Sequence, residues 1–219
     1  MSIAENLTDV RRAIKKAAGE KACETRLIAV SKTRPLEDVS AALDAGQLLF
    51  GENRVQEAVE KFTALKSSRA DLELHLIGPL QSNKVREAVR LFDVIQTVDR
   101  PKIAAALAKE IEEQGRAPRL FVQVNVGEEP QKSGVLPHEL AGFLSDCRTV
   151  HGLTIEGLMC IPPVNEEPAP YFYLLKQMAR DQGVPLLSMG MSHDYETAVQ
   201  FGADYVRVGT AIFGRRPAA

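Results

Sequence analysis

The sequence predicts a single (β/α)8 TIM barrel, for three reasons. Short β-like runs alternate with helical patterns from one end of the 219 residues to the other, and no Pro/Gly/Ser linker or low-complexity stretch separates two domains. There are eight such runs, which favours a closed α/β barrel over an open doubly wound sheet. The residues with the clearest chemistry follow the first and the eighth run, which are neighbours only if the sheet closes. We therefore expect residues 1–219 to form one domain.

Each predicted element has its own signal. The first helix has an apolar stripe at three- and four-residue spacing with basic residues between, so it should pack on the outside of the barrel. Pro35 at a first-turn position and Gly46 past the end delimit a second helix, and Val55, Val59 and Phe62 form the stripe of a third. The first stripe consists of Ile3, Leu7, Val10, Ile14 and Ala17. The predicted strands are Leu27–Ser31, Leu48–Glu52, Leu74–Gly78, Val94–Val98, Leu120–Val126, Leu153–Met159, Leu186–Gly190 and Tyr205–Val208.

Composition and charge narrow the class of protein. A hydrophobic content of 45% suits one large core, and a net charge of −2 with a pI near 6.1 lacks the basic character that nucleic-acid binding favours. The cysteines, Cys23, Cys147 and Cys160, have no C-x-x-C spacing, which argues against a disulfide framework and fits a reducing cytoplasm. No basic segment precedes an apolar stretch at the N-terminus, and no apolar run approaches the length of a membrane span. We expect neither nucleic acid nor a membrane as a partner.

Lys32 is the first candidate site residue. It closes the first predicted strand, so it should lie at the C-terminal mouth of the barrel, where binding groups gather. Partial desolvation and nearby cations lower the pKa of a lysine amine, and the neutral amine can then condense with an aldehyde. The simpler interpretation is that Lys32 is a solvated surface charge. Lys84 and Lys132 follow other strands and are competing candidates for the reactive amine.

A second candidate lies near the C-terminus. Arg207 stands between two valines, so strand alternation can point its guanidinium into the barrel, toward either a ligand or a buried ion pair. Gly209 and Thr210 follow, where the N–H groups of a helix start can bind a phosphate. Ser192 follows the seventh strand, although Ser192 and Thr210 could also simply cap helices. An aldehyde site beside a phosphate site indicates pyridoxal 5′-phosphate (PLP), which carries both groups.

Other polar residues near the strands have simpler explanations. Asn53 and His75 occupy strand or strand-end positions, where each alone is best explained by a core or loop hydrogen bond. The four histidines have no close paired spacing such as H-x-x-x-H, so we expect no metal site. Cys160, near a strand end, is interpreted as a small apolar filler rather than a nucleophile.

Several longer segments carry a family resemblance. They are Ala29-Val30-Ser31-Lys32, Phe50-Gly51-Glu52-Asn53, the stretch from His75 to Lys84, Ser188-Met189-Gly190-Met191-Ser192, and the stretch from Val206 to Gly214. On these segments the chain resembles, over nearly its whole length, the pyridoxal phosphate homeostasis protein family, also called the YggS/PROSC family. That family is itself similar to the N-terminal barrel domain of alanine racemase. Two positions depart from it: Arg54 stands where a tyrosine is common, and His193 where a small or acidic residue is frequent.

The resemblance implies a set of roles. Lys32 forms a Schiff base with PLP, and Arg207 approaches the pyridine nitrogen. Ser192, Gly209 and Thr210 hold the phosphate. Asn53 and His75 lie beside the cofactor. The family is regarded as a regulator or carrier in intracellular vitamin B6 homeostasis without established catalysis, so the resemblance implies binding more than turnover, with PLP-dependent apoenzymes as candidate partners.

Two enzymatic alternatives remain open. An amino-acid racemase needs a second proton-transfer group across the cofactor from Lys32. The sequence ends soon after the phosphate segment, so we expect no second domain to supply a tyrosine, and the four tyrosines of the chain have no special claim. A cation facing the pyridine nitrogen also weakens the ring as an electron sink, although alanine racemase is similar in this respect. A Schiff-base aldolase acting on a phosphorylated sugar fits the same lysine and phosphate groups.

Overall fold

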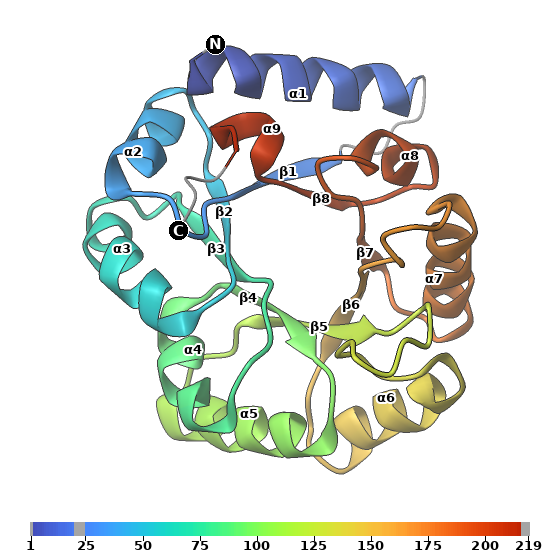
Figure 1. Cartoon of the computed structure of the whole chain (residues 1–219). Helices are drawn as coiled ribbons and strands as arrows, with labels where there is room; N and C mark the ends of the chain where they lie inside the picture. Colours follow the sequence, from blue (N-terminus) through green and yellow to red (C-terminus); the bar gives the residue numbers. More distant parts are fainter. Residues whose placement is uncertain (1, 20–24, 216–219) are drawn as a thin grey trace.

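Eight parallel strands close into a barrel in the order of the chain. The computed structural model describes residues 2–19 and 25–215, and within them β1 pairs with both β2 and β8 (Figure 1). The predicted closed barrel is therefore confirmed. The strands are β1 (Arg26–Val30), β2 (Leu49–Glu52), β3 (Glu73–Leu76), β4 (Val94–Val98), β5 (Arg119–Val124), β6 (Ile155–Cys160), β7 (Leu186–Ser188) and β8 (Tyr205–Val208).

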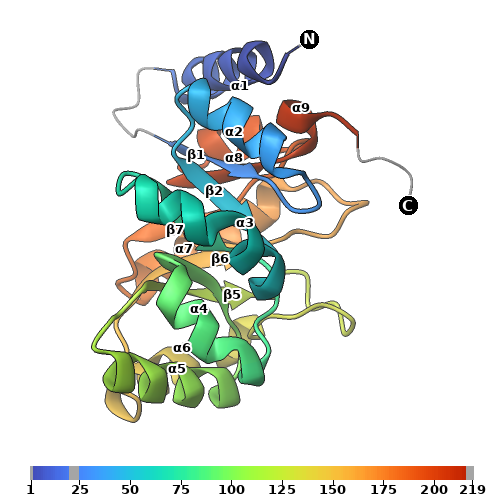
Figure 2. The same cartoon turned by 90° about the vertical axis from the view of Figure 1, so that its left-hand side faces the viewer.

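Helices surround the barrel and connect its strands. They are α1 (Ile3–Ala18), α2 (Leu36–Asp44), α3 (Val55–Ser68), η1 (Ser82–Lys84), α4 (Val85–Leu91), α5 (Pro101–Gln114), η2 (Pro137–Glu139), α6 (Leu140–Thr149), α7 (Ala169–Asp181), α8 (Tyr195–Gln200) and α9 (Thr210–Phe213). The helix after β8 is only four residues long. Helix α1 fills the place that α9 is too short to cover, and it packs against α2, α8 and α9 at one side of the ring (Figures 1 and 2).

The predicted elements agree with the structure except at their ends. The stripe of α1 faces inward, with Leu7, Val10 and Ile14 buried, so its predicted outer position is confirmed. Pro35 precedes α2 instead of standing in its first turn, because its ψ of 166° is extended. The sixth strand begins two residues later than predicted, because the N–H of Leu153 still bonds to the Cys147 carbonyl at the end of α6 (2.8 Å).

The hydrophobic residues form two separate clusters. The larger one fills the space between the strands and the helices, and aromatic contacts such as Phe50 with Phe62 tie β2 to α3. The smaller one contains Ile28, Val94 and Phe121, which come from β1, β4 and β5. Because β1 is a neighbour of neither β4 nor β5 in the sheet, its side chain can meet theirs only inside the barrel. The barrel is thus filled at this level, and it is not a pore.

Charged side chains close the N-terminal end of the barrel. Glu73 accepts hydrogen bonds from Arg26 (2.8 Å) and Arg119 (2.5 Å), and both guanidinium groups also donate to the Tyr205 hydroxyl. Burial opposes ionisation of this carboxyl, but the hydrogen bond from His75, the charge of Arg119 and the hydrogen bond from Arg26 lower the pKa of Glu73 to about 2. Glu73 is therefore an anion at all ordinary pH values.

Replacing Glu73 by glutamine is expected to make protein stability less dependent on acid. A lowered pKa stabilises the fold above the ordinary value near 4.5, and this contribution is lost as the pH falls toward 2. Because the carboxylate is partly exposed and screened by water, we expect the variant to lose about 2 kcal/mol of unfolding free energy at neutral pH. Urea denaturation of both proteins from neutral pH to acid measures the difference. A stability gap that stays constant as the pH falls would contradict this assignment.

Candidate functional site

The barrel closure brings the ends of the first and the last strand together at the C-terminal mouth. Ala29 of β1 pairs with Val208 of β8. Lys32 lies two residues beyond the end of β1, and Gly209 directly follows β8. A Cβ atom added at Gly209 would lie 3.3 Å from the carbonyl oxygen of Val30. The first strand end and the start of the last helix are therefore in contact.

The turn that carries Lys32 is held from outside the barrel by α3. The Lys61 ammonium donates to the carbonyl of Ser31 (2.7 Å), and Glu57 accepts from the N–H of Thr33. Thr33 has a φ of 61°, a left-handed conformation that costs a residue with a Cβ atom about 1–2 kcal/mol. The surrounding contacts must offset this strain, so the turn after β1 has one imposed shape.

Glu52, the last residue of β2, is the buried anchor of the same contacts. It is fully buried, and its Oε1 accepts from the Ser31 hydroxyl and from Lys61, both at 2.6 Å. Burial raises the pKa of the Glu52 carboxyl above its usual value, although the bonds from Lys61 and Ser31 act in the opposite direction. Lys61 therefore ties the backbone beside Lys32 to a carboxyl group that is costly to leave unpaired.

The predicted phosphate residues come from two adjacent turns. Ser192, which follows β7, accepts a hydrogen bond through its Oγ from the N–H of Gly209 (3.2 Å). Thr210 begins α9, and the first N–H groups of a helix have no partner within it. Gly190 has a φ of 92°, and a Cβ atom there would lie 2.5 Å from that of Ala198 in α8. The turn that presents Ser192 thus depends on a glycine.

Arg207 points into the barrel and is 4% exposed. Its Nη1 donates to the Ser188 hydroxyl (2.7 Å) and its Nη2 to the Cys160 carbonyl (2.8 Å). No carboxylate of the described residues lies within ion-pair distance, so the buried ion pair considered from the sequence is not found. Burial lowers the pKa of Arg207. A desolvated cation held only by neutral acceptors is suited to an electron-rich ligand.

Asn53 and His75 take different positions. Asn53 directly follows β2, and its backbone packs so closely on Gly78 that a Cβ atom there would lie 2.3 Å from the Asn53 carbonyl oxygen. His75 is fully buried inside the barrel, where its ring nitrogens contact Glu73 (2.7 Å) and Gln96 (2.9 Å). Both ring nitrogens are therefore already occupied by protein groups.

The remaining residues that the sequence singled out have other surroundings. Lys84 pairs with Glu87 (3.3 Å) and Lys132 with Glu129. Burial raises the pKa of the Cys160 thiol to about 12, which agrees with its interpretation as an apolar filler. The family departures, Arg54 and His193, are both exposed. Cys23 lies outside the described residues. Within them no group of three acidic, histidine or cysteine side chains could hold a metal ion.

Sequence reasoning missed the residues that support the candidate site. Gln96 and Ser188 are polar residues in apolar strands, and both are fully buried. A polar residue in such a strand could have been recognised in the sequence as a candidate for the barrel interior. Glu52 also carries a signal, as a charged residue that ends a strand. Lys61 carries none, because a lysine in an amphipathic helix resembles any solvated charge.

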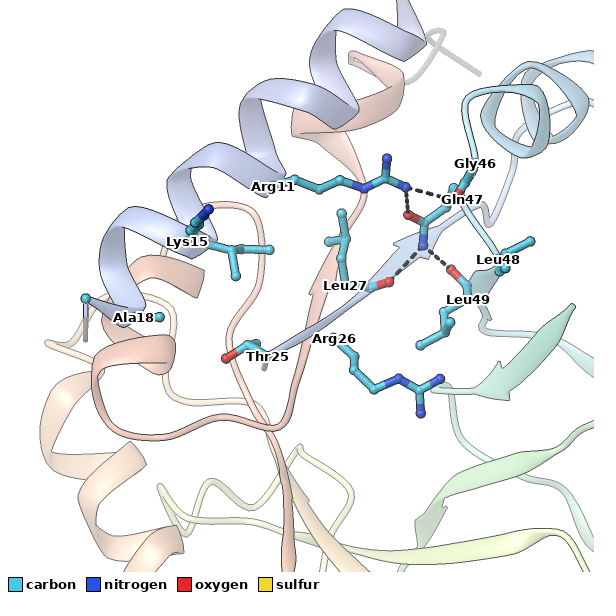
Figure 3. Close-up of a pocket in the computed structure, with 12 residues that line it drawn as sticks. Arg11, Lys15, Ala18, Thr25, Arg26, Leu27, Gly46, Gln47, Leu48 and Leu49 are labelled. Atoms are coloured by element: carbon cyan, nitrogen blue, oxygen red, sulfur yellow. Dashed lines mark hydrogen bonds between the residues drawn. The ribbon is translucent and has the colours of Figure 1, made fainter. Parts of the chain in front are cut away.

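A separate pocket of about 630 Å³ opens at the opposite end of the barrel (Figure 3). It lies between α1, the start of β1 and the turn before β2, and it includes Arg11, Thr25 and Gln47. The Gln47 amide spans the base of this pocket, donating to the carbonyls of Leu27 and Leu49. Active sites of such barrels form at the C-terminal mouth, so this pocket is not the candidate site.

The fold and the arrangement of the site first define a class. A closed parallel barrel with a lysine after its first strand and a glycine turn after its last fits the family model of the alanine racemase N-terminal domain, which matches residues 2–217. Alanine racemase of Corynebacterium glutamicum shares the fold, with a TM-score of 0.72 at 22% identity over 99% of this chain and 62% of the racemase. This likeness establishes the barrel architecture.

Closer relatives define the family within that class. The pyridoxal phosphate homeostasis protein of Pasteurella multocida is 39% identical over 229 residues, covering 99% of this chain and 98% of the relative. The structure of PipY from Synechococcus elongatus PCC7942, solved with PLP bound, has a TM-score of 0.84 at 38% identity and covers 97% of this chain and all of PipY. The chain belongs to the pyridoxal phosphate homeostasis protein family.

Proposed function

We propose that this chain binds PLP through a Schiff base at Lys32 and acts in intracellular vitamin B6 homeostasis, without catalysing a reaction of its own. The observation that carries the proposal is the contact between the ends of β1 and β8, since it brings Lys32 and the Gly209 turn to one mouth of the barrel. PipY, the relative solved with PLP, has the same fold over its whole length.

The residues at the mouth match the parts of the cofactor. PLP supplies an aldehyde that an amine can attack, together with a phosphate and a pyridine ring. Lys32 offers the amine. The N–H groups at the start of α9, with the Ser192 hydroxyl that the N–H of Gly209 holds in place, offer donors for the phosphate. Arg207 offers a guanidinium for the ring nitrogen. Asn53 follows the neighbouring strand β2, and we assign it a place beside the pyridine ring. We assign Thr210 to the phosphate.

Two features favour binding over racemisation. A guanidinium at the ring nitrogen disfavours protonation of the ring, so the ring withdraws electrons less strongly. A racemase also needs a proton donor opposite Lys32. Tyr205 is inside the barrel, but its hydroxyl is bound by Arg26 and Arg119 at the N-terminal end. It is therefore held at the end of the barrel away from Lys32.

The proposed setting follows from the same chemistry. A carrier of PLP has PLP-dependent apoenzymes as recipients, and these enzymes are the partners that we propose, in the cytoplasm. No helix of the described residues is both long and apolar enough to span a bilayer.

The visible absorption spectrum of the purified protein, before and after adding PLP, tests the proposed function. We expect a band that borohydride abolishes, with the reduced label on the peptide that contains Lys32. Incubation with L-alanine should then yield no D-alanine. A colourless protein that PLP does not change would overturn the proposal in favour of the aldolase, and rapid formation of D-alanine would overturn it in favour of the racemase.

A further inference from the structure

A continuous set of hydrogen bonds runs through the interior of the barrel from one end to the other. It begins at Arg207, whose Nη1 donates to the Ser188 hydroxyl (2.7 Å), and continues from the Ser188 hydroxyl to the Oε1 of Gln96 (2.6 Å). The Gln96 amide then contacts Nδ1 of His75 (2.9 Å), and Nε2 of His75 contacts Glu73 (2.7 Å). Each of the first four side chains is at most 4% exposed.

The direction of every bond is fixed from the Glu73 end. An ionised carboxylate can only accept, so the proton of the His75 ring lies on Nε2. Burial lowers the pKa of His75, which keeps the ring neutral despite the nearby carboxylate. Nδ1 is therefore an acceptor, and the amide nitrogen of Gln96 must face it.

The same logic continues to the other end. With its nitrogen facing His75, Gln96 presents its carbonyl oxygen to Ser188, and the hydroxyl proton of Ser188 is committed to that oxygen. The Ser188 oxygen is left as an acceptor, which suits the guanidinium of Arg207. All donors point the same way, and such aligned bonds polarise and strengthen one another.

On the basis of the proposed function, we infer that Gln96 and Ser188, fixed in direction by His75 and Glu73, are positioning residues that orient the Arg207 guanidinium toward the cofactor ring. His75 then acts through this set of bonds and not through a hydrogen bond of its own to PLP. The carboxylate of Glu73, at the N-terminal end, thereby determines how the cation at the C-terminal mouth is held. The other titratable groups that act on Arg207 are the Cys160 thiol and the Asp194 carboxylate.

The test compares Gln96→Leu with Gln47→Leu in the full chain. Gln47 is a matched control because it is also buried, and its amide donates to two carbonyls (2.8 and 2.7 Å) and accepts from Arg11 (3.0 Å). It lies at the N-terminal end of the barrel, outside the set of bonds (Figure 3). Both substitutions remove hydrogen bonds of a buried amide, so both should destabilise the fold, but only Gln96→Leu interrupts the bonds that lead through Ser188 to Arg207.

Two readouts separate positioning from stability. Without cofactor, NMR of the Arg207 guanidinium should show restricted rotation in the wild type and in Gln47→Leu, and faster rotation in Gln96→Leu. With PLP, Gln96→Leu should bind about tenfold more weakly than Gln47→Leu, as is typical when a supporting residue of a site is lost. Its spectral transition should also move to higher pH, because a poorly held cation opposes protonation of the cofactor less.

The outcomes distinguish this inference from the proposed function. Equal affinity, spectra and guanidinium rotation in the two variants would overturn the positioning role and leave PLP binding by the wild type intact. Failure of the wild-type chain to bind PLP would overturn the proposed function and the inference together. Ser188→Ala removes a single hydroxyl and supplies the same comparison if Gln96→Leu does not fold.

Discussion

Lys32→Ala is expected to abolish the reducible bond between the protein and PLP while leaving the barrel folded. Lys32 lies beyond the end of β1, and the Ser31 hydroxyl and carbonyl beside it are held by Glu52 and Lys61. Removing the amine therefore removes the group that attacks the aldehyde but none of these contacts. The visible band should disappear, borohydride should fix no label on the chain, and the circular dichroism spectrum should not change.

Two other lysines at the same end of the barrel serve as controls. Lys84 pairs with Glu87, and Lys132 pairs with Glu129 and donates to the Pro162 carbonyl (3.0 Å). Lys84→Ala and Lys132→Ala should each retain the label on Lys32. A label that persists in Lys32→Ala would show that a different amine carries the cofactor, and peptide mapping would identify which one.

Gly190→Ala is expected to have the largest effect on the phosphate turn. The φ of 92° is unfavourable for alanine, and the new Cβ would lie 2.5 Å from the Cβ of Ala198 and 3.0 Å from the Cα of Tyr195. The turn and α8 must separate, so we expect a loss of about 3 kcal/mol of unfolding free energy from strain and overpacking combined. Because Ser192 is two residues away, PLP affinity should also fall, by about tenfold or more, which corresponds to the loss of one or two hydrogen bonds to a charged group.

Gly183→Ala separates the cost of backbone strain from the cost of steric overlap. Gly183 has a φ of 63°, also left-handed, but no atom lies within 4 Å of an added Cβ. This variant should lose about 1 kcal/mol, the cost of the conformation alone, with unchanged affinity. Urea denaturation and a PLP titration give both quantities. Wild-type affinity in Gly190→Ala would mean that the turn after β7 does not hold the phosphate.

The number and order of the strands were predictable because each strand is a short apolar run between helical patterns. Val94–Val98 was predicted with its observed ends, whereas the third strand ends at Leu76, before the predicted Gly78. Gly78 belongs instead to the turn that packs on the backbone of Asn53. Such a contact depends on the neighbouring strand, which no local pattern describes.

The candidate site was predictable only in the residues that belong to motifs. Lys32, Gly209 and Ser192 stand at strand ends where chemistry is expected, and the structure places them at one mouth. Lys61 and Glu52 act through contacts between a helix and a strand, and Gln96 and Ser188 through contacts across the barrel interior. These partners are distant in sequence, so only the closed fold reveals them.

The pairing of β1 with β8 is the seam at which the barrel closes, and the proposed cofactor would connect its two sides. The seam joins the first and the last strand, so it is the last strand pairing of the barrel that a chain emerging from the ribosome can complete. A ligand anchored to Lys32 on one side and to Gly209 on the other binds only after that seam has formed. Such a ligand stabilises the native state by about 2.7 kcal/mol when its concentration is a hundred times its dissociation constant. Loss of the cofactor would therefore remove a link between β1 and β8 and lower the stability of the whole barrel.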